Sequence, residues 1–351
     1  MQQPSALVTG ANGFLGSRLV RHLVERGEHV KAFVRPAANL DALRGLPEQQ
    51  VTIAVGDIQS PHTVYRALLG CNRVYHVAAN FAFWDKKPER IMAPAVQGTR
   101  AVLEAARERR IKKIVVTSTT GTLGATTEPT PMDETHAFNL SDAEIYFIAK
   151  LEAERVALEL AKQGVPVVVV NPASIFGPGD WKPTPTGELL LRYLNWPPAR
   201  RMPLAPKGGI SVVDVDDVAV GHRLAMERGR IGERYVLGGE NLELRDLLQR
   251  VLPEVTGFAP ILSSVSESTL TLAARALELK ARFGGGEPPL LTPKLVKNHV
   301  LRYHWVSSSK AEQELGYGYR PASETLARAV RWYVSHGYVR ETAAARAYRV
   351  A

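Results

Sequence analysis

The first half of the chain alternates short apolar runs with longer amphipathic stretches. Several apolar runs are rich in β-branched residues and lack polar alternation, which is typical of strands buried on both faces. Six runs predict strands, at Ala6–Val8, His29–Val34, Val51–Val55, Arg73–Val77, Ile114–Thr117 and Val165–Val170. Helical spacing between them predicts helices at Gly16–Arg26, Pro61–Leu69, Gln97–Glu108 and Asp142–Gln163. This alternation predicts a doubly wound parallel sheet of the α/β class.

The pattern changes after Asn171-Pro172. Residues Gly177–Gly209 are rich in Pro and Gly, and two strand-like pieces then flank a helical stretch at Asp217–Arg228. From Leu242 to Val300 the pattern is mostly helical. We expect a dinucleotide-binding domain over residues 1–177, joined by 210–238 and roughly 303–320, a smaller, mainly helical substrate lobe over 178–209 and 239–302, and C-terminal helices over 321–351.

Composition indicates an ordinary globular protein, since 45% of the 351 residues are hydrophobic and 23% are charged. No apolar run approaches 18 residues, so we expect no membrane span. Cys71 is the single cysteine, which excludes a disulfide within the chain and a cysteine-based metal site. With no signal-like segment after Met1, these features favour a cytoplasmic location.

The net charge of +9 raises the question of an anionic partner. The basic residues are scattered and form no tail or aromatic-interleaved strand, so we do not expect nucleic-acid binding. A polyanionic cofactor is a sufficient partner. The long helices could pair across a dimer or pack on the sheet, which leaves monomer and homodimer open.

A glycine-rich turn follows the first predicted strand directly. It reads Thr9-Gly10-Ala-Asn-Gly13-Phe-Leu-Gly16 and leads into an amphipathic helix. Glycines let a backbone approach a pyrophosphate closely, and a helix N-terminus attracts the anion. In this strand–turn–helix context the spacing predicts a dinucleotide phosphate site.

The ends of the next two strands bear on which dinucleotide binds. The second ends in Arg35 and lacks a carboxylate that could accept from a ribose 2′-OH. Arg35 is therefore expected to pair a 2′-phosphate, which favours NADP(H) over NAD(H), with a solvated arginine as the alternative. Asp57, at the end of the third strand, is expected either to accept from an adenine amino group or to cap a turn.

A second chemical signature is Tyr146-Phe-Ile-Ala-Lys150, whose ends share a helix face. A nearby ammonium lowers the pKa of a phenol, which makes tyrosine useful in proton transfer near neutral pH. The preceding strand ends in the hydroxyl-rich segment Thr117–Gly121, which could polarise a carbonyl or form a polar turn.

Together these features resemble the extended short-chain dehydrogenase/reductases over most of the chain. The motifs that carry the resemblance are Thr9-Gly-x-x-Gly-x-x-Gly16, Asp57-Ile58, His76-Val-Ala-Ala79, the Thr117–Thr119 hydroxyls, Tyr146-x-x-x-Lys150, Asn171-Pro172, Gly177-Pro178, Val215-Asp-Asp-Val218 and Ser308-Ser-Lys-Ala311. Two positions depart from the family pattern. Ala95 stands where Asn is usual, and Asp214 stands where His is more frequent.

The resemblance implies roles for individual residues. It implies Tyr146 as acid/base and Lys150 as its pKa-lowering, ribose-binding partner. Thr119 would polarise the substrate carbonyl, with Ser118 as the neighbouring alternative. The implied cofactor-binding residues are Gly10, Asn12, Gly13, Phe14, Leu15, Gly16, Arg35, Asp57, Ile58, Ala78, Ala79, Lys150, Pro172, Ala173, Ser174 and Ile175.

Two branches of the family compete. Val34-Arg35 resembles the NADPH-preferring dihydroflavonol reductases and related carbonyl reductases, and Ala95 removes an amide that could hold a polar substrate. Lys182-Pro-Thr-Pro-Thr-Gly187 resembles the sugar epimerases of hopanoid gene clusters. Three aromatic residues after the fourth strand suit a flat apolar substrate, or equally packing against the second lobe: Phe81, Phe83 and Trp84.

We therefore expect an NAD(P)H-dependent reductase of a ketone or aldehyde on a hydrophobic small molecule. A nucleotide-sugar epimerase or dehydratase that recycles its cofactor is the enzymatic alternative, with Lys182, Arg200 and Arg201 available for a diphosphate. A non-catalytic NADP-binding regulator would be expected to lose Tyr146 and Lys150, and this chain keeps both.

Overall fold

The structure is a computed structural model that describes residues 5–79, 87–195, 206–257, 261–262, 266–283 and 291–339. Its largest element is a seven-stranded sheet in which all neighbouring strands are parallel. The strand order is β3-β2-β1-β4-β5-β6-β9. The strand bounds are β1 Ser5–Thr9, β2 Val30–Val34, β3 Val51–Val55, β4 Cys71–His76, β5 Lys113–Thr117, β6 Val167–Pro172 and β9 Arg234–Leu237.

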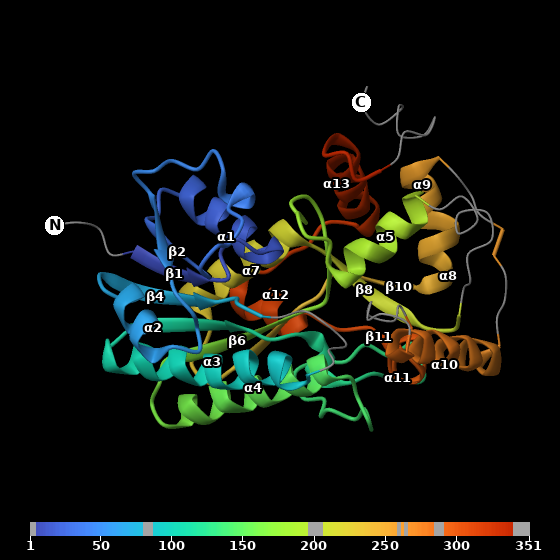
Figure 1. The fold of residues 1–351 in the computed structure, drawn as a ribbon, viewed down its shortest axis with the longest axis horizontal. Helices are drawn as coiled ribbons and strands as arrows, with labels where there is room; N and C mark the ends of the chain where they lie inside the picture. Colours follow the sequence, from blue (N-terminus) through green and yellow to red (C-terminus); the bar gives the residue numbers. More distant parts are fainter. Residues whose placement is uncertain are drawn as a thin grey trace.

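Helices cover both faces of this sheet (Figure 1). The central strands are buried on both faces because one apolar core lies under α1 and α7 and another lies under α2, α3 and α4. The bounds of these helices are α1 Phe14–Glu25, α2 Pro61–Ala67, α3 Glu89–Glu108, α4 Ile145–Lys162 and α7 Val215–Arg228. Two 3₁₀ turns add η1 at Asp41–Leu43 and η2 at Thr120–Leu123.

A second lobe lies beyond the carboxyl ends of the strands and has its own sheet (Figure 1). Its strands are β7 Ser174–Phe176, β8 Gly209–Asp214, β10 Glu240–Glu243 and β11 Tyr303–His304, and all three others pair with β8. Its helices are α5 Pro185–Asn195, α8 Leu244–Asp246, α9 Leu252–Thr256, α10 Glu267–Phe283, α11 Pro293–Leu295 and α13 Ala322–Ser335, with π-helical turns η3 Leu247–Val251 and η4 Val296–Val300. A third apolar core joins α5, α9, α13 and β8.

The remaining helix, α12 at Ser309–Leu315, packs on α7 and β9 and so returns the chain to the large sheet. The strand order reverses direction between β1 and β4, where successive crossovers lead to opposite sides of the sheet. In open α/β sheets this switch point opens a crevice at the carboxyl ends of the strands, where ligands bind. The fold thus points to one edge of the sheet as the place to look for a site.

The predicted parallel α/β fold is confirmed, with differences in detail. α3 begins at Glu89 rather than Gln97 and contains Pro94, a residue that argues against a helix because it lacks an N–H donor. The strands at β7, β10 and β11 are two to four residues long and carry no periodic signal of their own. They form because β8 offers them a buried partner. Among the described residues, no helix is long and apolar enough to cross a membrane.

Candidate active site at the carboxyl edge of the sheet

The glycine-rich turn packs directly against the end of β4. Gly10 has φ +67°, in the left-handed region that favours glycine, and a Cβ there would lie 2.8 Å from the Cα of Ala78. A Cβ at Gly16 would lie 2.1 Å from the carbonyl oxygen of Gly10. Both contacts are with backbone, so only glycine fits, and the turn meets β4 at the switch point.

The first turn of α1 has no side chain capping it. Gly13 is the N-cap, and Phe14 and Leu15 begin the helix, half-buried and buried respectively. The positive end of the helix dipole and its first N–H groups therefore face the glycine turn. This arrangement suits the pyrophosphate of a dinucleotide.

Asn12 connects this turn to the loop after β2. Its Nδ2 donates to the carbonyl oxygen of Asn39 at 3.1 Å. Arg35 begins that loop and is exposed, so its guanidinium is accessible to a ligand.

Asp57 lies in the turn after β3 and is exposed. Its carboxylate accepts from the backbone N–H of Gln59 at 2.9 Å, which is the turn-capping contact expected as one alternative. Ile58 is half-buried and packs on α3 at Gly98. A Cβ at Gly98 would lie 2.8 Å from the Cδ1 of Ile58.

A buried polar chain ties β1, β4 and α3 together beneath the turn. The Thr9 hydroxyl accepts from the backbone N–H groups of Val77 at 3.1 Å and Ala78 at 3.2 Å. It also contacts His76 Nδ1 at 2.9 Å, and His76 Nε2 lies 3.1 Å from the Thr99 hydroxyl. Burial lowers the pKa of His76 to about 3, so the ring is neutral and its hydrogen bonds fix the end of β4.

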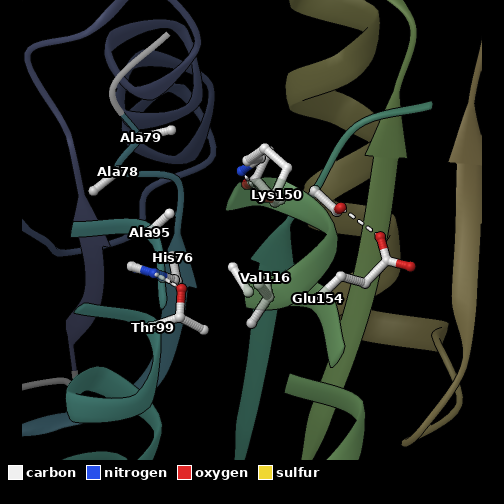
Figure 2. A pocket seen from close by; sticks show the side chains of 11 residues that line it. His76, Ala78, Ala79, Ala95, Thr99, Val116, Lys150 and Glu154 are labelled. Atoms are coloured by element: carbon white, nitrogen blue, oxygen red, sulfur yellow. Dashed lines mark hydrogen bonds between the residues drawn. The ribbon is translucent and has the colours of Figure 1, made fainter. Parts of the chain in front are cut away.

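A small pocket lies between the ends of β4 and β5, α3 and the inner face of α4 (Figure 2). Ala78, Ala79 and Ala95 line one side, and Lys150 and Glu154 line the other. The small side chain at Ala95, where the resembling family usually has Asn, adds no polar group to that wall. The same side also carries His76 and Thr99, which contact each other, and the opposite side carries charge.

Lys150 is buried, and its ammonium donates to the carbonyl oxygen of Thr117 at 2.6 Å. Burial lowers its pKa to about 8, against the opposing charge of Glu154. Tyr146 lies one helical turn earlier and is also buried. Burial raises the pKa of Tyr146, because desolvation disfavours the phenolate. This effect outweighs the decrease in pKa that was expected from the nearby Lys150.

The two candidate hydroxyls beside Lys150 differ in their partners. Ser118 is buried, and its hydroxyl donates to the carboxylate of Glu154. Thr119 is half-buried, and its Oγ1 accepts from the backbone N–H of Gly121 at 3.2 Å as the N-cap of η2. The Thr119 hydroxyl proton has no acceptor in these contacts, whereas that of Ser118 is engaged.

Sequence reasoning missed a cluster beneath this hydroxyl turn, which we call the Glu154 cluster. Glu154 accepts from the Thr122 hydroxyl at 2.9 Å, from Asn171 Nδ2 at 2.8 Å and from Arg234 Nη1 at 2.8 Å, besides Ser118. The signal for Glu154 was its position four residues after Lys150 on a buried helix face. Nothing local marks Arg234, which reaches Glu154 from β9.

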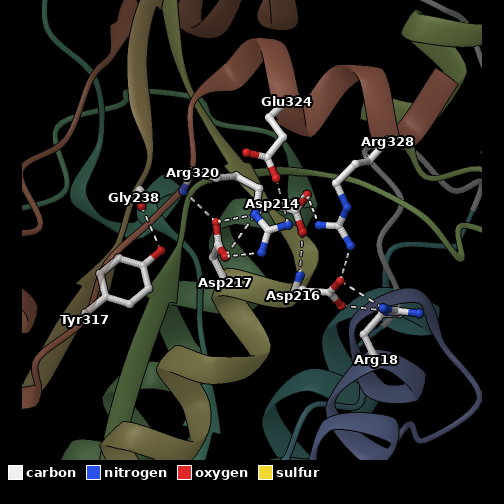
Figure 3. A network of polar contacts seen from close by, with 9 residues as sticks. All are labelled: Arg18, Asp214, Asp216, Asp217, Gly238, Tyr317, Arg320, Glu324 and Arg328. Atoms are coloured by element: carbon white, nitrogen blue, oxygen red, sulfur yellow. Dashed lines mark hydrogen bonds and ion pairs between the residues drawn. The ribbon is translucent and has the colours of Figure 1, made fainter. Parts of the chain in front are cut away.

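A second polar cluster, the Asp214 network, joins the two lobes (Figure 3). It contains Asp214, Asp216, Asp217, Arg18, Arg320 and Arg328. Asp214 is fully buried, caps α7 by accepting from the N–H of Asp216 at 2.8 Å, and lies 2.6 Å from Arg328 Nη1. Where the resembling family more often has His, this chain thus holds a carboxylate with a capping and ion-pairing role.

Other contacts of the network reach α1 and the C-terminal helix. Arg18 on α1 binds Asp216 through Nε at 2.6 Å and Nη2 at 2.8 Å, and Arg328 on α13 contacts the same carboxylate. Arg320 Nη2 lies 2.7 Å from Asp217. The helix that follows the glycine turn is therefore fastened to the second lobe.

The remaining predicted residues lie between the two sheets or outside the description. Pro172 ends β6 and is buried, and Ala173, Ser174 and Ile175 lead half-buried into β7. Lys182 is exposed, before α5. Five predicted substrate residues fall outside the described residues: Phe81, Phe83, Trp84, Arg200 and Arg201.

Known proteins share this sequence and architecture along almost their whole length. The chain is 37% identical over 338 residues to a putative dihydroflavonol 4-reductase of Synechocystis sp., covering 95% of each chain. It is 31% identical over 345 residues to sterol demethylase protein B of Methylococcus capsulatus, covering 95% of this chain and all of the relative. The crystal structure of gox2253 superposes with a TM-score of 0.83 at 38% identity, over 96% of this chain and all of that one.

A sequence profile of the NAD dependent epimerase/dehydratase family matches residues 6–238. The matched range begins with β1 and the glycine turn and ends after β9, so it contains the whole seven-stranded sheet. The chain therefore belongs to the NAD dependent epimerase/dehydratase family and is a nicotinamide-dependent enzyme of it.

Proposed function

We propose that the protein is an NAD(P)H-dependent reductase of a ketone or aldehyde carbonyl on a hydrophobic small molecule, aromatic ones included. The observation that carries this is the pocket beside the glycine turn, which is lined by Thr117, Ser118 and Lys150. Tyr146 lies one helical turn before Lys150, and Thr119 directly follows Ser118 at the start of η2. A reductase relative of 37% identity supports the same reaction class.

The residues at the switch point fit a dinucleotide. The glycine turn leaves a cradle in which a Cβ would collide with backbone, and the start of α1 is uncapped. Gly10, Gly13 and Gly16 would hold the pyrophosphate, and Ala78 and Ala79 would border the nicotinamide. Bound there, the reduced nicotinamide supplies a hydride.

The protein's own groups would manage the oxygen and its proton. The Thr119 hydroxyl would donate a hydrogen bond to the carbonyl oxygen and so polarise it. Tyr146 protonates the developing alkoxide, and its raised pKa keeps it protonated at neutral pH, as a proton donor must be. Lys150 orients the site from the carbonyl of Thr117 and would bind the ribose hydroxyls.

An apolar substrate fits the cavity better than a charged one. On the side formed by Ala78, Ala79 and Ala95, the two polar side chains, His76 and Thr99, already contact each other. The names of two relatives, a dihydroflavonol 4-reductase and a sterol demethylase protein, refer to ring compounds of limited polarity. We therefore propose ketones on fused or linked rings as the first compounds to assay.

The central experiment replaces Tyr146 by Phe. Turnover in the reduction of a panel of aromatic and alicyclic ketones should fall by about 10²- to 10⁴-fold, since general-acid catalysis supplies that much. The dissociation constant of the cofactor, measured by fluorescence, should stay within about 2-fold. Tyr319→Phe, at an exposed tyrosine, is the control and should match wild type. Undiminished turnover in Tyr146→Phe would refute the proposal.

The cofactor proposal is separate and rests on Arg35. Arg35→Ala should raise the KM for NADPH by about 10-fold and leave that for NADH nearly unchanged, because the guanidinium pairs only with a 2′-phosphate. A wild-type preference for NADH would contradict this role.

A nucleotide-sugar epimerase or dehydratase is the second candidate, favoured by the family's description and by the Lys182–Gly187 segment. Such an enzyme keeps and recycles its dinucleotide. Protein purified with dinucleotide bound and active without added cofactor would support it, whereas consumption of NADPH in proportion to product would support the reductase. A non-catalytic NADP-binding regulator is a minor third candidate, and ketone turnover would exclude it.

A further inference from the structure

Three aromatic rings form a column between the second lobe and the start of α4. The rings of His304 and His299 are stacked with centroids 4.7 Å apart, and those of His299 and Phe147 are stacked at 4.3 Å. Phe147 directly follows Tyr146, and their rings meet edge to face at 5.2 Å. The column thus ends beside the proposed proton donor.

Phe147 also packs on the hydroxyl turn. A Cβ at Gly121 would lie 2.3 Å from two ring carbons of Phe147, so the ring contacts bare backbone there. Gly121 belongs to η2, and its N–H is the one that Thr119 Oγ1 accepts from. One ring therefore contacts both elements that carry the proposed chemistry.

Glu144 fixes the column in place. It is the N-cap residue of α4, yet its side chain makes no capping bond and instead meets His299 Nε2 at 2.9 Å. His299 Nδ1 lies 3.0 Å from His304 Nε2. With a proton on Nε2 of each ring, His304 donates to His299 Nδ1 and to the carbonyl oxygen of Asn298 at 3.2 Å, and His299 donates to Glu144.

Further contacts from the same second-lobe segment reach the residues before α4. Lys294 pairs with Asp142 at 2.5 Å, and Asn298 Nδ2 donates to the carbonyl oxygen of Asp142 at 3.3 Å. Asp142 has φ +56°, an unusual backbone conformation for a residue other than glycine. The start of α4 is thus held from outside rather than by its own cap.

We propose that His299 is a positioning residue for catalysis: by bridging Glu144 and Phe147, it holds the first turn of α4 and the η2 turn together, so that Tyr146 and Thr119 face one point. The inference rests on the proposed function for these two roles. Helix ends fray when uncapped, and a displacement of about 1 Å at a reacting group lowers turnover by about 10²-fold.

The kinetic test compares variants along the column. His299→Ala should lower kcat by about 30- to 100-fold while KM for the ketone changes less than about 3-fold. Glu144→Ala should behave alike, and Glu144→Gln, which keeps the acceptor for His299, should recover most of kcat. Lys297→Gln, at an exposed lysine of the same turn η4, is the matched control and should stay within about 2-fold. Equal kcat in Glu144→Ala and Glu144→Gln, or an effect on KM alone, would overturn the inference.

A second readout needs no substrate. In protein loaded with NADPH, amide hydrogen exchange should accelerate in peptides covering residues 118–126 and 142–150 for His299→Ala but not for Lys297→Gln. Unchanged exchange in these peptides would refute the clamp whatever the activity. Faster exchange in a protein that reduces no carbonyl would keep the clamp and refute the proposed function. Should His299→Ala fail to fold, His299→Phe keeps the stack, loses the bond to Glu144, and is measured in the same way.

Discussion

The Glu154 cluster and the Asp214 network are both buried or half-buried polar groups, yet they are built differently. In the first, one carboxylate that is 3% exposed gathers three neutral donors and one guanidinium. In the second, three carboxylates face three guanidinium groups, whose side chains are 21–26% exposed. The first lies within the large sheet, and the second spans three helices of both lobes (Figure 3).

The two arrangements suit different structural roles. Neutral hydrogen bonds around one charge have short, directional geometry, so they fix the hydroxyl turn that carries Ser118 and Thr119. Several partly exposed charges attract one another over a broader range of geometry and are weakened by salt. They fasten α1 to the second lobe without demanding the same accuracy of position.

The largest expected effect comes from breaking the Glu154 cluster. Glu154→Ala removes the carboxylate that Arg234 and three buried donors share, so the free energy of unfolding should fall by about 3–5 kcal/mol. Urea denaturation measures this. Glu152→Ala, an exposed carboxylate on the same helix, is the control and should stay within about 0.5 kcal/mol. A loss below about 1 kcal/mol for Glu154→Ala would show that the cluster is not a fixed centre.

Removing one side chain from the Asp214 network should lower the free energy of unfolding less, because each charge in the network has more than one partner. Arg328→Ala removes a partner of both Asp214 and Asp216, yet Arg320 and Arg18 remain. We expect a loss of about 2–3 kcal/mol in the free energy of unfolding, with thermal denaturation as the measurement. A loss as large as that of Glu154→Ala would erase the contrast between the two regions.

Low pH tests the fold in another way, because the buried His76 and His222 and the half-buried His304 are held neutral in the folded protein. Burial lowers the pKa of His76 and His304 to about 3 and that of His222 to about 4. In the unfolded chain these histidines have a pKa near 6.5, so below that pH the unfolded state binds more protons than the folded state. The free energy of unfolding therefore falls as pH falls from 6.5 toward 4. Each histidine contributes about 1.4 kcal/mol per pH unit within this window.

Urea denaturation at two pH values tests that slope. His222→Asn should lose about 1 kcal/mol less than wild type between about pH 7.5 and pH 5.5, since one buried proton acceptor is gone. His136→Asn, at a half-exposed histidine, should follow wild type. Parallel slopes in wild type and His222→Asn would mean that the ring is not kept neutral by the fold.

The smallest effect is expected at the edge of the network. Arg18 is one-quarter exposed, so Arg18→Gln should cost about 1 kcal/mol at low ionic strength and less near about 1 M NaCl. Thermal denaturation at both salt concentrations measures the difference, with the exposed Arg26→Gln as control. A salt-independent loss would show that Arg18 acts by packing its stem on Gly179 rather than by charge.

Much of the fold and part of the candidate site could be predicted from local sequence patterns. The apolar runs, the glycine turn and the spacing of Tyr146 and Lys150 are each set by neighbours within a few residues, and the fold and family follow from them. Glu154 carried such a signal too, four residues beyond Lys150.

What could not be predicted depends on contacts between distant segments. Arg234 meets Glu154 across 80 residues, and His299 meets Glu144 across 155. β10 and β11 form by pairing with β8, and their own sequences are too short to show a periodic pattern that would predict them. Residue type and spacing do not indicate which distant segments pair, so these contacts are seen only in the folded structure.

The seventh strand of the large sheet has a consequence for how the protein is made. β9 pairs with β6, but β7, α5, β8 and α7 lie between them in the chain, and β7 and β8 belong to the other sheet. During synthesis the apolar edge of β6 therefore stays unpaired until residue 237 has emerged. An unpaired hydrophobic edge strand promotes association with other chains, so the vulnerable period of this protein lies in the middle of translation, between the completion of β6 and the synthesis of β9.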